Sequence, residues 1–331
     1  MVDLFFVADT KCFVSVTDLA ASNTKVPLGG RGASLFYLRQ MDKERLFQQL
    51  SSIRKFSQAG KRAPHKPLLL LYALGQWQHG VKQINWTEHE ERMQHLLEPF
   101  ANGKSSMEHP FLRLTSDAKG QLWELTNYDY RTGDGYTAKK LREANATAQL
   151  GKEVVDFLSS DPMALHELAA FILDQEFPSS LHEDILSACG IAYQMVPSTA
   201  QERERRRDPA FREKVLTAYN RRCAVCGFDL RLGDQLIGLE AAHIRWHNQG
   251  GPDITTNGIA LCVLHHKLLD FGMLGFTDEA QLLVSRKANG TAAFEDQVLR
   301  YEGQQIQLPR FVEDQPAAEY FAWQRKEVFR G

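Results

Sequence analysis

The sequence predicts an α+β protein of two globular domains. Its 331 residues suggest two or three domains, because single hydrophobic cores rarely grow beyond about 250–300 residues. Helical patterns alternate with a few short apolar runs over residues 41–190, which indicates a mixed domain. Over residues 209–331, cysteines and histidines have the spacing of metal ligands, which predicts a second domain held by a structural metal ion.

Composition and charge exclude several classes of protein. The formal charge is −2, so nucleic acid would have to bind through local basic patches. The chain has no apolar run of about 18 residues and no signal-peptide pattern at its start, so no membrane partner is expected. Three of the five cysteines cluster with histidines, which favours a metal site in a reducing, cytoplasmic compartment over a disulfide framework.

Residues 1–40 differ in character from the rest of the chain. They carry few helical signals and a glycine-rich piece, whereas Met41 opens a strongly helical stretch predicted over 42–57. Two interpretations are open. These residues are an extension before the true start at Met41, either mis-assigned or a loose arm, or they form a short β-hairpin that packs on the core.

Within residues 41–190, the best-defined element is a buried helix from Leu68 to Gly75. Pro67 is expected at its first position and Gly75 in its last turn, in agreement with helix start and stop signals. The other predicted elements are short. Helices are expected over 87–100, 137–147, 151–158 and 163–174, and strands over 111–114 and 122–125 with a turn at 117–120 between them.

Residues 191–208 are the predicted linker between the two domains. They contain Pro197 and the charge run 202–207. Residues 201–222 hold eight Lys and Arg against four Asp and Glu. This local positive charge indicates either a solvated helix face or phosphate contacts beside the second domain.

Four residues of the second domain have the spacing of a structural zinc site. Cys223 and Cys226 form a CxxC knuckle, and Cys262 and His265 form a CxxH knuckle. Zn²⁺ takes four thiolate or imidazole ligands in a tetrahedron, and two knuckles about 36 residues apart can supply them from opposite sides of a loop. The alternative is two unrelated pairs with a redox or core role.

Further elements occur in a fixed order between and after the knuckles. They are a predicted strand at 239–244 carrying His243, a sharp turn at 250–253, the pair Asn257-Gly258, and His266 before a predicted helix at 267–270. With the two knuckles, this order resembles the HNH or ββα-metal endonuclease family. The resemblance covers residues 208–285.

The resemblance implies roles for three residues. His243 would be the general base, Asn257 the central asparagine of the motif, and His266 the metal-binding histidine. Phosphodiester hydrolysis fits these residue types, because a neutral imidazole takes a proton from water while Mg²⁺, Mn²⁺ or another divalent ion stabilises the leaving oxygen. Asn257 is expected to fix the loop beside the His243 strand by hydrogen bonds to the backbone.

The sequence departs from the family at the second metal ligand. Many relatives have Asp or His just before the general base, where this chain has Ala242. Two acids are candidates for that role. Asp270 lies four residues after His266, on the same face of a helix, whereas Glu240 lies three before His243, on the opposite face of a strand. This placement favours Asp270.

Three segments of the first domain carry a second resemblance, at 62–71, 109–114 and 177–185. Together they resemble the sulfur-binding domain of bacterial phosphorothioate-dependent, type IV restriction endonucleases. That family joins such a domain to a C-terminal HNH domain, and over residues 41–290 the order here is the same. The resemblance implies a bacterial protein of the cytoplasm.

It also implies binding of double-stranded DNA in which sulfur replaces a backbone oxygen. Sulfur is larger and more weakly hydrated than oxygen, so a shallow apolar cup favours it while cations hold the phosphate charge. Pro110 and His109 are candidates for the cup, although the family has an aromatic residue where His109 stands. The candidate phosphate or base-edge contacts are Arg62, His65, Lys66, Arg113 and Arg142.

Other functions stay open on the sequence. The first domain could read unmodified DNA or methylcytosine, with Trp77, Trp86 and Trp123 as a cage for a flipped base. Alternatively, the protein binds DNA through a zinc-containing domain and does not cut it, although the intact HNH residues oppose this. A clean double-strand cut needs two active sites, which makes a homodimer plausible. The tail, 286–331, with a strand-like piece at 305–309 and an aromatic-rich helix, is expected to pack on the HNH core or at a dimer contact.

Overall fold

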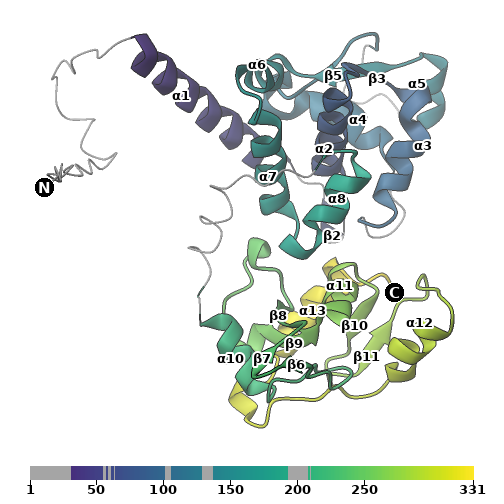
Figure 1. The fold of residues 1–331 in the computed structure, drawn as a ribbon. Helices are drawn as coiled ribbons and strands as arrows, with labels where there is room; N and C mark the ends of the chain where they lie inside the picture. Colours follow the sequence, from purple (N-terminus) through teal and green to yellow (C-terminus); the bar gives the residue numbers. More distant parts are fainter. Residues whose placement is uncertain are drawn as a thin grey trace, which may run out of the picture. The chain divides into compact units, whose positions relative to one another are not determined.

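The computed structural model describes most of the chain from position 31 onward (Figure 1). The described residues are 31–54, 57–58, 61–62, 64–100, 106–128, 137–192, 208 and 210–331. Almost all of the predicted linker, its charge run, and residues 1–30 of the predicted extension therefore lie outside them. Contacts divide the chain into Met1–Glu44 and Arg45–Gly331, and the second unit contains two separate hydrophobic cores.

The first core surrounds one helix, α2 (His65–Gln78), which is buried continuously from Pro67 to Gly75. A helix that is apolar all round needs cover on every side. That cover comes from α3 (Trp86–Leu97), α4 (Glu108–Arg113) and α7 (Ala164–Glu176). Gly75 is required here, because a Cβ would lie 1.8 Å from the carbonyl oxygen of Cys189, just after α8 (His182–Ala188).

A small antiparallel sheet completes the first domain. Its strand order is β3-β5-β4, with β5 (Thr147–Leu150) between β3 (Gln83–Asn85) and β4 (Trp123–Leu125). Trp123 is fully buried, and its indole N–H donates to the carbonyl of Phe111 over 2.8 Å. The remaining elements are β1 (Ser57–Gln58), β2 (Lys61–Arg62), α5 (Ala138–Glu143), α6 (Lys152–Ser160) and the 3₁₀ turn η3 (Ser179–Leu181).

Several predicted elements of this domain are confirmed and others are wrong. The helices expected over 87–100, 151–158 and 163–174 are α3, α6 and α7, and the strand at 122–125 is β4. The strand expected at 111–114 is wrong. Those residues belong to α4 and to the following 3₁₀ helix η2 (Leu114–Gly120). Pro110 is compatible with this, because it lies in the first turn of α4, where its missing N–H costs no helical hydrogen bond.

Three helix boundaries also differ from the prediction. Helix α1 (Arg31–Ser51) crosses Met41 without a break and ends six residues earlier than expected. Pro67 is the third residue of α2, where a missing N–H still costs no helical bond, and α2 continues past Gly75. The helix expected over 137–147 ends at Glu143, because Asn145 takes a positive φ of 50° before β5 begins.

The second core belongs to a strand–strand–helix unit. Strands β8 (Leu239–His243) and β9 (Gly258–Cys262) pair antiparallel, with Leu239 opposite Cys262 and His243 opposite Gly258. Helix α11 (Val263–Asp270) comes directly after β9, and α10 (Phe211–Ala218) contacts both strands (Figure 1). The strand predicted at 239–244 and the helix at 267–270 are therefore confirmed. A short hairpin, β6 (Arg231–Leu232) and β7 (Gln235–Leu236), precedes β8.

The C-terminal tail packs on this second core. After α11 come β10 (Leu274–Phe276), β11 (Leu282–Val284), α12 (Ala292–Gln297) and α13 (Ala318–Glu327). Phe321 of α13 is buried in the core, which confirms the first of the two expectations for the tail. The strand-like piece at 305–309 is reduced to one isolated bridge between Gln305 and Gln281.

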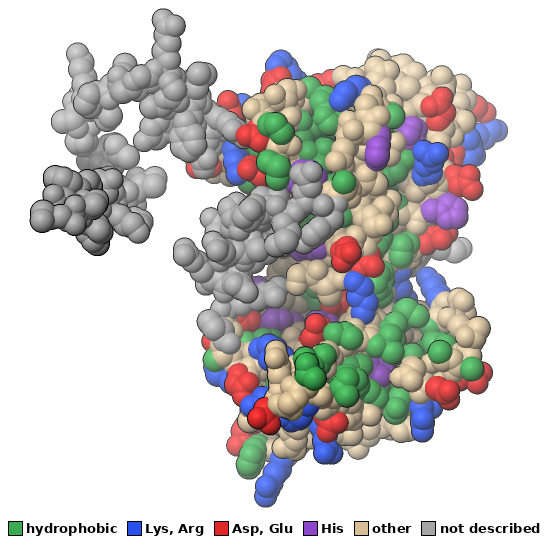
Figure 2. Space-filling view, in the orientation of Figure 1, with side chains coloured by type: hydrophobic (Ala, Val, Ile, Leu, Met, Phe, Trp, Pro, Cys, Tyr) green, Lys and Arg blue, Asp and Glu red, His purple; other side chains and the backbone are tan. Residues whose placement is uncertain are grey.

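Charge on the surface is mixed. Figure 2 shows basic and acidic side chains interspersed over the visible face, in keeping with a formal charge of −2. Among the residues that the structure describes, every helix is too short or too polar to cross a bilayer.

Candidate nuclease and DNA-reading sites

The two knuckles meet in one cluster. One ligand atom each from Cys223, Cys226, Cys262 and His265 lies within 4.8 Å of the other three. The Nδ1 atom of His265 is 3.1 Å from the sulfur of Cys262 and 3.6 Å from that of Cys223. Its Nε2 lies 2.9 Å from the carbonyl oxygen of Gln297, so Nε2 carries the hydrogen and Nδ1 offers a lone pair to the sulfurs.

Local backbone geometry builds this cluster. The amide of Gly227 donates to the carbonyl of Cys223, and Gly227 has a φ of 72°, which closes the first knuckle. Cys262 ends β9 and His265 lies in the first turn of α11, so strand pairing fixes the second. Hydrogen bonds from the thiols of Cys226 and Cys262 hold the pKa of Cys223 well below its ordinary value. This donor set of three sulfurs and one imidazole, buried except for the half-buried Cys226, fits Zn²⁺.

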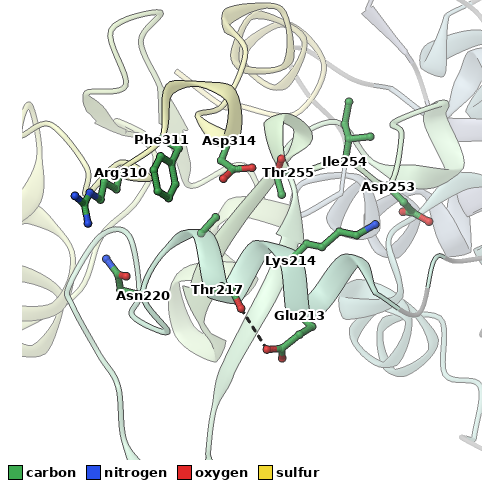
Figure 3. A pocket seen from close by; sticks show the side chains of 11 residues that line it. Glu213, Lys214, Thr217, Asn220, Asp253, Ile254, Thr255, Arg310, Phe311 and Asp314 are labelled. Atoms are coloured by element: carbon green, nitrogen blue, oxygen red, sulfur yellow. Dashed lines mark hydrogen bonds between the residues drawn. The ribbon is translucent and has the colours of Figure 1, made fainter.

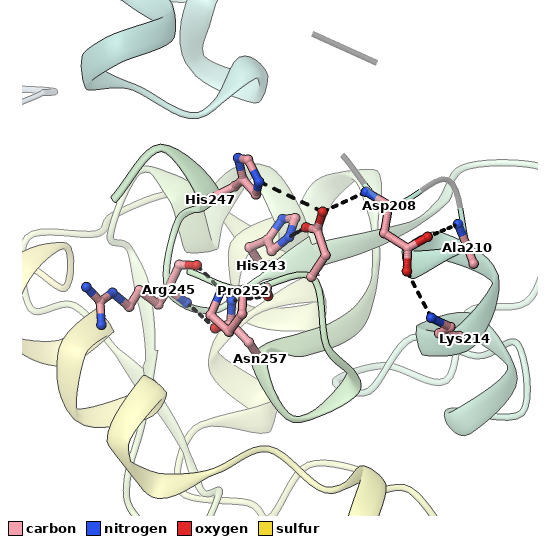
Figure 4. A network of polar contacts seen from close by, with 9 residues as sticks. Asp208, Ala210, Lys214, His243, Arg245, His247, Pro252 and Asn257 are labelled. Carbon is pink, nitrogen blue, oxygen red and sulfur yellow. Dashed lines mark hydrogen bonds and ion pairs between the residues drawn. The ribbon is translucent and has the colours of Figure 1, made fainter. Parts of the chain in front are cut away.

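The predicted general base, His243, stands at the end of β8. Its Nε2 is 2.7 Å from Oδ1 of Asp253, and each side chain is 13% exposed. The imidazole is stacked on the ring of Phe211, with centroids 4.1 Å apart and planes 9° apart. The carboxylate of Asp253 also accepts the backbone N–H of Asp208 over 2.7 Å, and the Nε2 of His247 lies 3.8 Å from it. In Figure 4, the dashed lines from Asp208, His243 and His247 meet at this one carboxylate.

Sequence reasoning missed both neighbours of His243. The sequence places Asp253 only in a predicted turn, and no motif in it singles out Phe211. Asp253 also forms one end of a surface pocket between α10 and residues 310–314 (Figure 3). The pair of His243 and Asp253 is thus partly open to solvent, as proton transfer from water requires.

Asn257 is fully buried and braces the loop between β8 and β9. Its Oδ1 accepts the amide hydrogen of Arg245 over 2.9 Å. Its Nδ2 donates to the carbonyl oxygens of Arg245 and Pro252, both over 3.0 Å (Figure 4). Gly251 leaves room for this bracing, because a Cβ there would lie 2.8 Å from Nδ2. These are contacts of the kind predicted for Asn257.

His266 lies on α11 between the two nominated acids. Its Nδ1 is 2.6 Å from Glu240, and its Nε2 is 3.2 Å from Asp270. Asp270 also accepts the indole N–H of Trp246 over 3.0 Å. Burial by itself lowers the pKa of His266, but Asp270 and Glu240 outweigh it and raise the pKa to about 10. The alternation of side chains along β8, which favoured Asp270 over Glu240, therefore does not prevent Glu240 from contacting His266.

This second group has the chemistry of a site for a hard cation. Two carboxylates and one imidazole suit Mg²⁺ or Mn²⁺ better than soft metals. The raised pKa of His266 reflects the same concentration of negative charge. Among the described residues, only the cysteine and histidine cluster brings three or more ligand atoms within 4.8 Å of one another, so the group at His266 is less tightly gathered.

The candidate DNA-reading residues do not share one environment. On α4, His109 and Arg113 are exposed while Pro110 is buried. His65 begins α2 and is half-buried, and the side chain of Arg62 lies outside the described residues. Arg142 donates through one nitrogen to both carboxylate oxygens of Glu90, each over 2.9 Å.

Lys66 differs from the others because its ammonium is largely enclosed. The side chain is only 14% exposed, and it pairs with Asp117, whose side chain is 1% exposed. It also donates to the carbonyl of Arg54 over 3.0 Å. The pair joins the start of α2 to η2, which continues the α4 segment. Lys66 therefore fixes η2, and with it the end of α4, to the start of α2.

Replacing Asp117 by alanine is expected to lower the free energy of unfolding of the first domain by about 3–5 kcal/mol. The variant leaves the enclosed Lys66 ammonium without its counter-charge. Urea denaturation of the full chain measures the change. The control is Asp156→Ala, which removes an exposed ion pair with Lys152 and should cost less than about 1 kcal/mol. Equal losses for the two variants would contradict the expectation.

Comparison with protein families assigns both domains. Residues 43–194 match the model of the ScoMcrA-like DNA sulfur-binding domain. Residues 223–277 match the model of an HNH endonuclease. The chain thus joins a DNA sulfur-binding domain to an HNH endonuclease domain. The first match is a DNA-binding domain and the second a nuclease domain, so the protein is a DNA-binding nuclease.

Solved structures give weaker likenesses. The sulfur-binding domain of ScoMcrA complexed with phosphorothioated DNA is 22% identical, with a TM-score of 0.37, over 44% of this chain and 97% of that one. The corresponding SprMcrA complex is 19% identical, with a TM-score of 0.38, over 45% and 93%. The modification-dependent restriction endonuclease TagI is 21% identical, with a TM-score of 0.27, over 42% and 41%. No curated protein matches. The domain assignments rest on the family models alone.

Proposed function

We propose that this protein recognises phosphorothioated double-stranded DNA through its first domain and cuts the DNA through its second. The observation that carries the proposal is the presence, in one chain, of a DNA sulfur-binding domain at 43–194 and an HNH endonuclease domain at 223–277. A domain that binds a modified DNA backbone can direct the nuclease domain to modified DNA. We place this activity in the bacterial cytoplasm.

In the proposed reaction, His243 takes a proton from the attacking water. Its partly exposed imidazole, held by Asp253 and Phe211, supports this role. Asn257 keeps the loop between β8 and β9 closed, which fixes the direction of the His243 ring.

His266, Asp270 and Glu240 would hold the divalent metal ion. Mg²⁺ or Mn²⁺ bound there supplies Lewis-acid stabilisation of the phosphate and the leaving oxygen. The contacts of both carboxylates with one imidazole support this assignment. Cys223, Cys226, Cys262 and His265 would hold Zn²⁺ in a purely structural role, since all four positions of a tetrahedron are taken by protein ligands.

For sulfur recognition, we propose that α4 supplies the contact surface. His109 and Arg113 are exposed there, whereas Pro110 is buried and is therefore less suited than His109 to contact sulfur. Arg62 and His65 would hold the phosphate charge, and Arg142 could join them, because an exposed ion pair is worth only about 0–1 kcal/mol and exchanges easily. Lys66 is less suited to contact DNA, because it would have to leave Asp117.

The alternatives have less support. A base-stacking cage for methylcytosine would need Trp86 and Trp123 at a surface, and both are fully buried. A DNA-binding protein without catalysis would have no need for His243, Asn257 and His266 together. A homodimer remains a proposal that would supply the two active sites of a double-strand cut.

The decisive experiment compares three plasmids of one sequence: phosphorothioated, methylated and unmodified. Each is incubated with the full chain and Mg²⁺ or Mn²⁺, and cleavage is followed on a gel. We expect selective cutting of the phosphorothioated plasmid. Equal cutting of all three plasmids would support the nuclease assignment and contradict the proposed recognition of sulfur. No cutting of any plasmid by zinc-loaded protein would favour binding without catalysis.

A further inference from the structure

We infer that Asp253 is the positioning residue of the general base: its carboxylate selects the ring tautomer of His243 that leaves Nδ1 to take the proton from water. The inference rests on the proposed function, because it assigns a partner to the histidine that the proposal makes catalytic. Neither the motif nor the family matches assign a role to Asp253.

The first argument is the direction of one hydrogen bond. Partial burial by itself raises the pKa of Asp253, but hydrogen bonds from the Asp208 amide and the His243 ring outweigh it, so the pKa lies below its ordinary value. The carboxylate is therefore ionised near neutral pH and can only accept. Nε2 of His243, 2.7 Å away, must carry the hydrogen. The lone pair of the neutral ring then lies on Nδ1.

The second argument is that the ring has little freedom to turn. Phe211, the first residue of α10, lies parallel to the imidazole at 4.1 Å and is itself buried in the second core. The stack fixes the plane of the ring, and the hydrogen bond to Asp253 fixes its rotation within that plane. A base held by two independent contacts needs no reorganisation when water is attacked.

The third argument is that Asp253 is itself held in place. Its second oxygen accepts the amide hydrogen of Asp208 over 2.7 Å. It comes directly after Pro252, whose carbonyl is bound by Nδ2 of Asn257 over 3.0 Å. The central asparagine of the motif therefore braces the turn that presents Asp253, so its effect would reach His243 through this carboxylate (Figure 4).

The charge of Asp253 would also act during the reaction. When His243 takes a proton, a cationic imidazolium forms, and an adjacent carboxylate stabilises it. Among the residues that the structure describes, His247 lies 3.8 Å from Asp253, and Asp208, whose amide binds Asp253, forms an ion pair with Lys214 of α10. An uncharged residue at 253 should therefore disfavour the imidazolium and also allow the wrong tautomer.

The test uses Asp253→Asn and Asp253→Glu in the full, zinc-loaded chain, on DNA that the unaltered protein cuts. We expect the Asn variant to bind this DNA normally but to cut it about 10²–10⁴-fold more slowly in single turnover. The rising limb of its pH profile should move to lower pH, because a negative charge beside the base is lost. The Glu variant should recover part of the rate. The control, Asp234→Asn, alters an exposed acid in the β6–β7 turn and should change nothing.

A second mutation separates this inference from the proposed function. In a His243→Ala background, Asp253→Asn should cause no further loss, since it acts through the ring that is missing. If His243→Ala cuts normally, the proposed base is wrong. If His243→Ala is inactive while Asp253→Asn cuts at the full rate, only the inference fails.

Nitrogen NMR of His243 in the unaltered protein gives an answer that does not depend on any variant folding. We expect the hydrogen of the neutral ring on Nε2. A hydrogen on Nδ1 would overturn the inference.

Discussion

Replacing Cys262 by alanine is expected to unfold the second domain and abolish cleavage while the first domain stays folded. Cys262 joins β9 to α11 and, with His265, supplies half of the cluster that ties this unit to the loop of Cys223 and Cys226. Binding of structural Zn²⁺ is worth about 10–16 kcal/mol, which is as large as the whole stability of a typical domain, about 5–15 kcal/mol. The first domain has its own core and should be spared.

Zinc content, circular dichroism, DNA binding and cleavage are measured on the same preparation. The control is Cys189→Ala, which removes the buried free thiol of the first core. That variant should keep its zinc and its cleavage and lose at most a few kcal/mol of stability in the first domain. The expectation fails if the Cys262 variant still carries stoichiometric metal and cuts DNA.

The zinc cluster could be predicted from sequence because each knuckle is local. A CxxC or CxxH spacing places two ligands on one turn whatever the rest of the fold does. The two knuckles then need one long-range contact, in which the backbone amide of Ala224 donates to the carbonyl of Ala260 on β9. The apolar segment around His243 indicates β8, the strand with which β9 pairs. The helix predicted at 267–270 is also a local feature, and it is the second half of α11, which begins earlier, at Val263.

The misread elements depend on information that periodicity does not contain. Residues 111–114 are three apolar residues around one arginine, a short run that fits a buried strand or a buried helix equally well, and the structure places them at the end of α4 and the start of η2. The pairing of Lys66 with Asp117 joins residues 51 positions apart, and no local pattern reports it. The resemblance at 62–71 therefore makes Lys66 a candidate DNA contact, whereas the structure pairs its side chain with Asp117.

The candidate catalytic site divides in the same way. The spacing of His266 and Asp270 on one helix face is a sequence property, and the structure places the two side chains 3.2 Å apart. The contact of Asp253 with His243 cannot be inferred from spacing, because it depends on the conformation of the loop at 245–252. That fold requires the three hydrogen bonds of Asn257 and the absence of a side chain at Gly251.

Replacing His243 by alanine should reduce the single-turnover cleavage rate by at least about 10²–10⁴-fold, the usual contribution of a general base. DNA binding and zinc content should not change, because His243 is not one of the zinc ligands. Lost stacking on Phe211 should cost only about 0.5–1.5 kcal/mol of stability. The control is His247→Ala, a more exposed histidine 3.8 Å from the same carboxylate, which should cut within a few-fold of the unaltered rate.

Added imidazole then distinguishes a general base from a metal ligand. In His243→Ala, the space between Phe211 and Asp253 can admit a free imidazole, so its addition should restore part of the rate. In His266→Ala, the lost group lies between Glu240 and Asp270, and a loose imidazole there would not hold a metal ion in place. Rescue of the His266 variant but not of the His243 variant would reverse the two assignments. Full activity of His243→Ala without imidazole would show that His243 is not the general base.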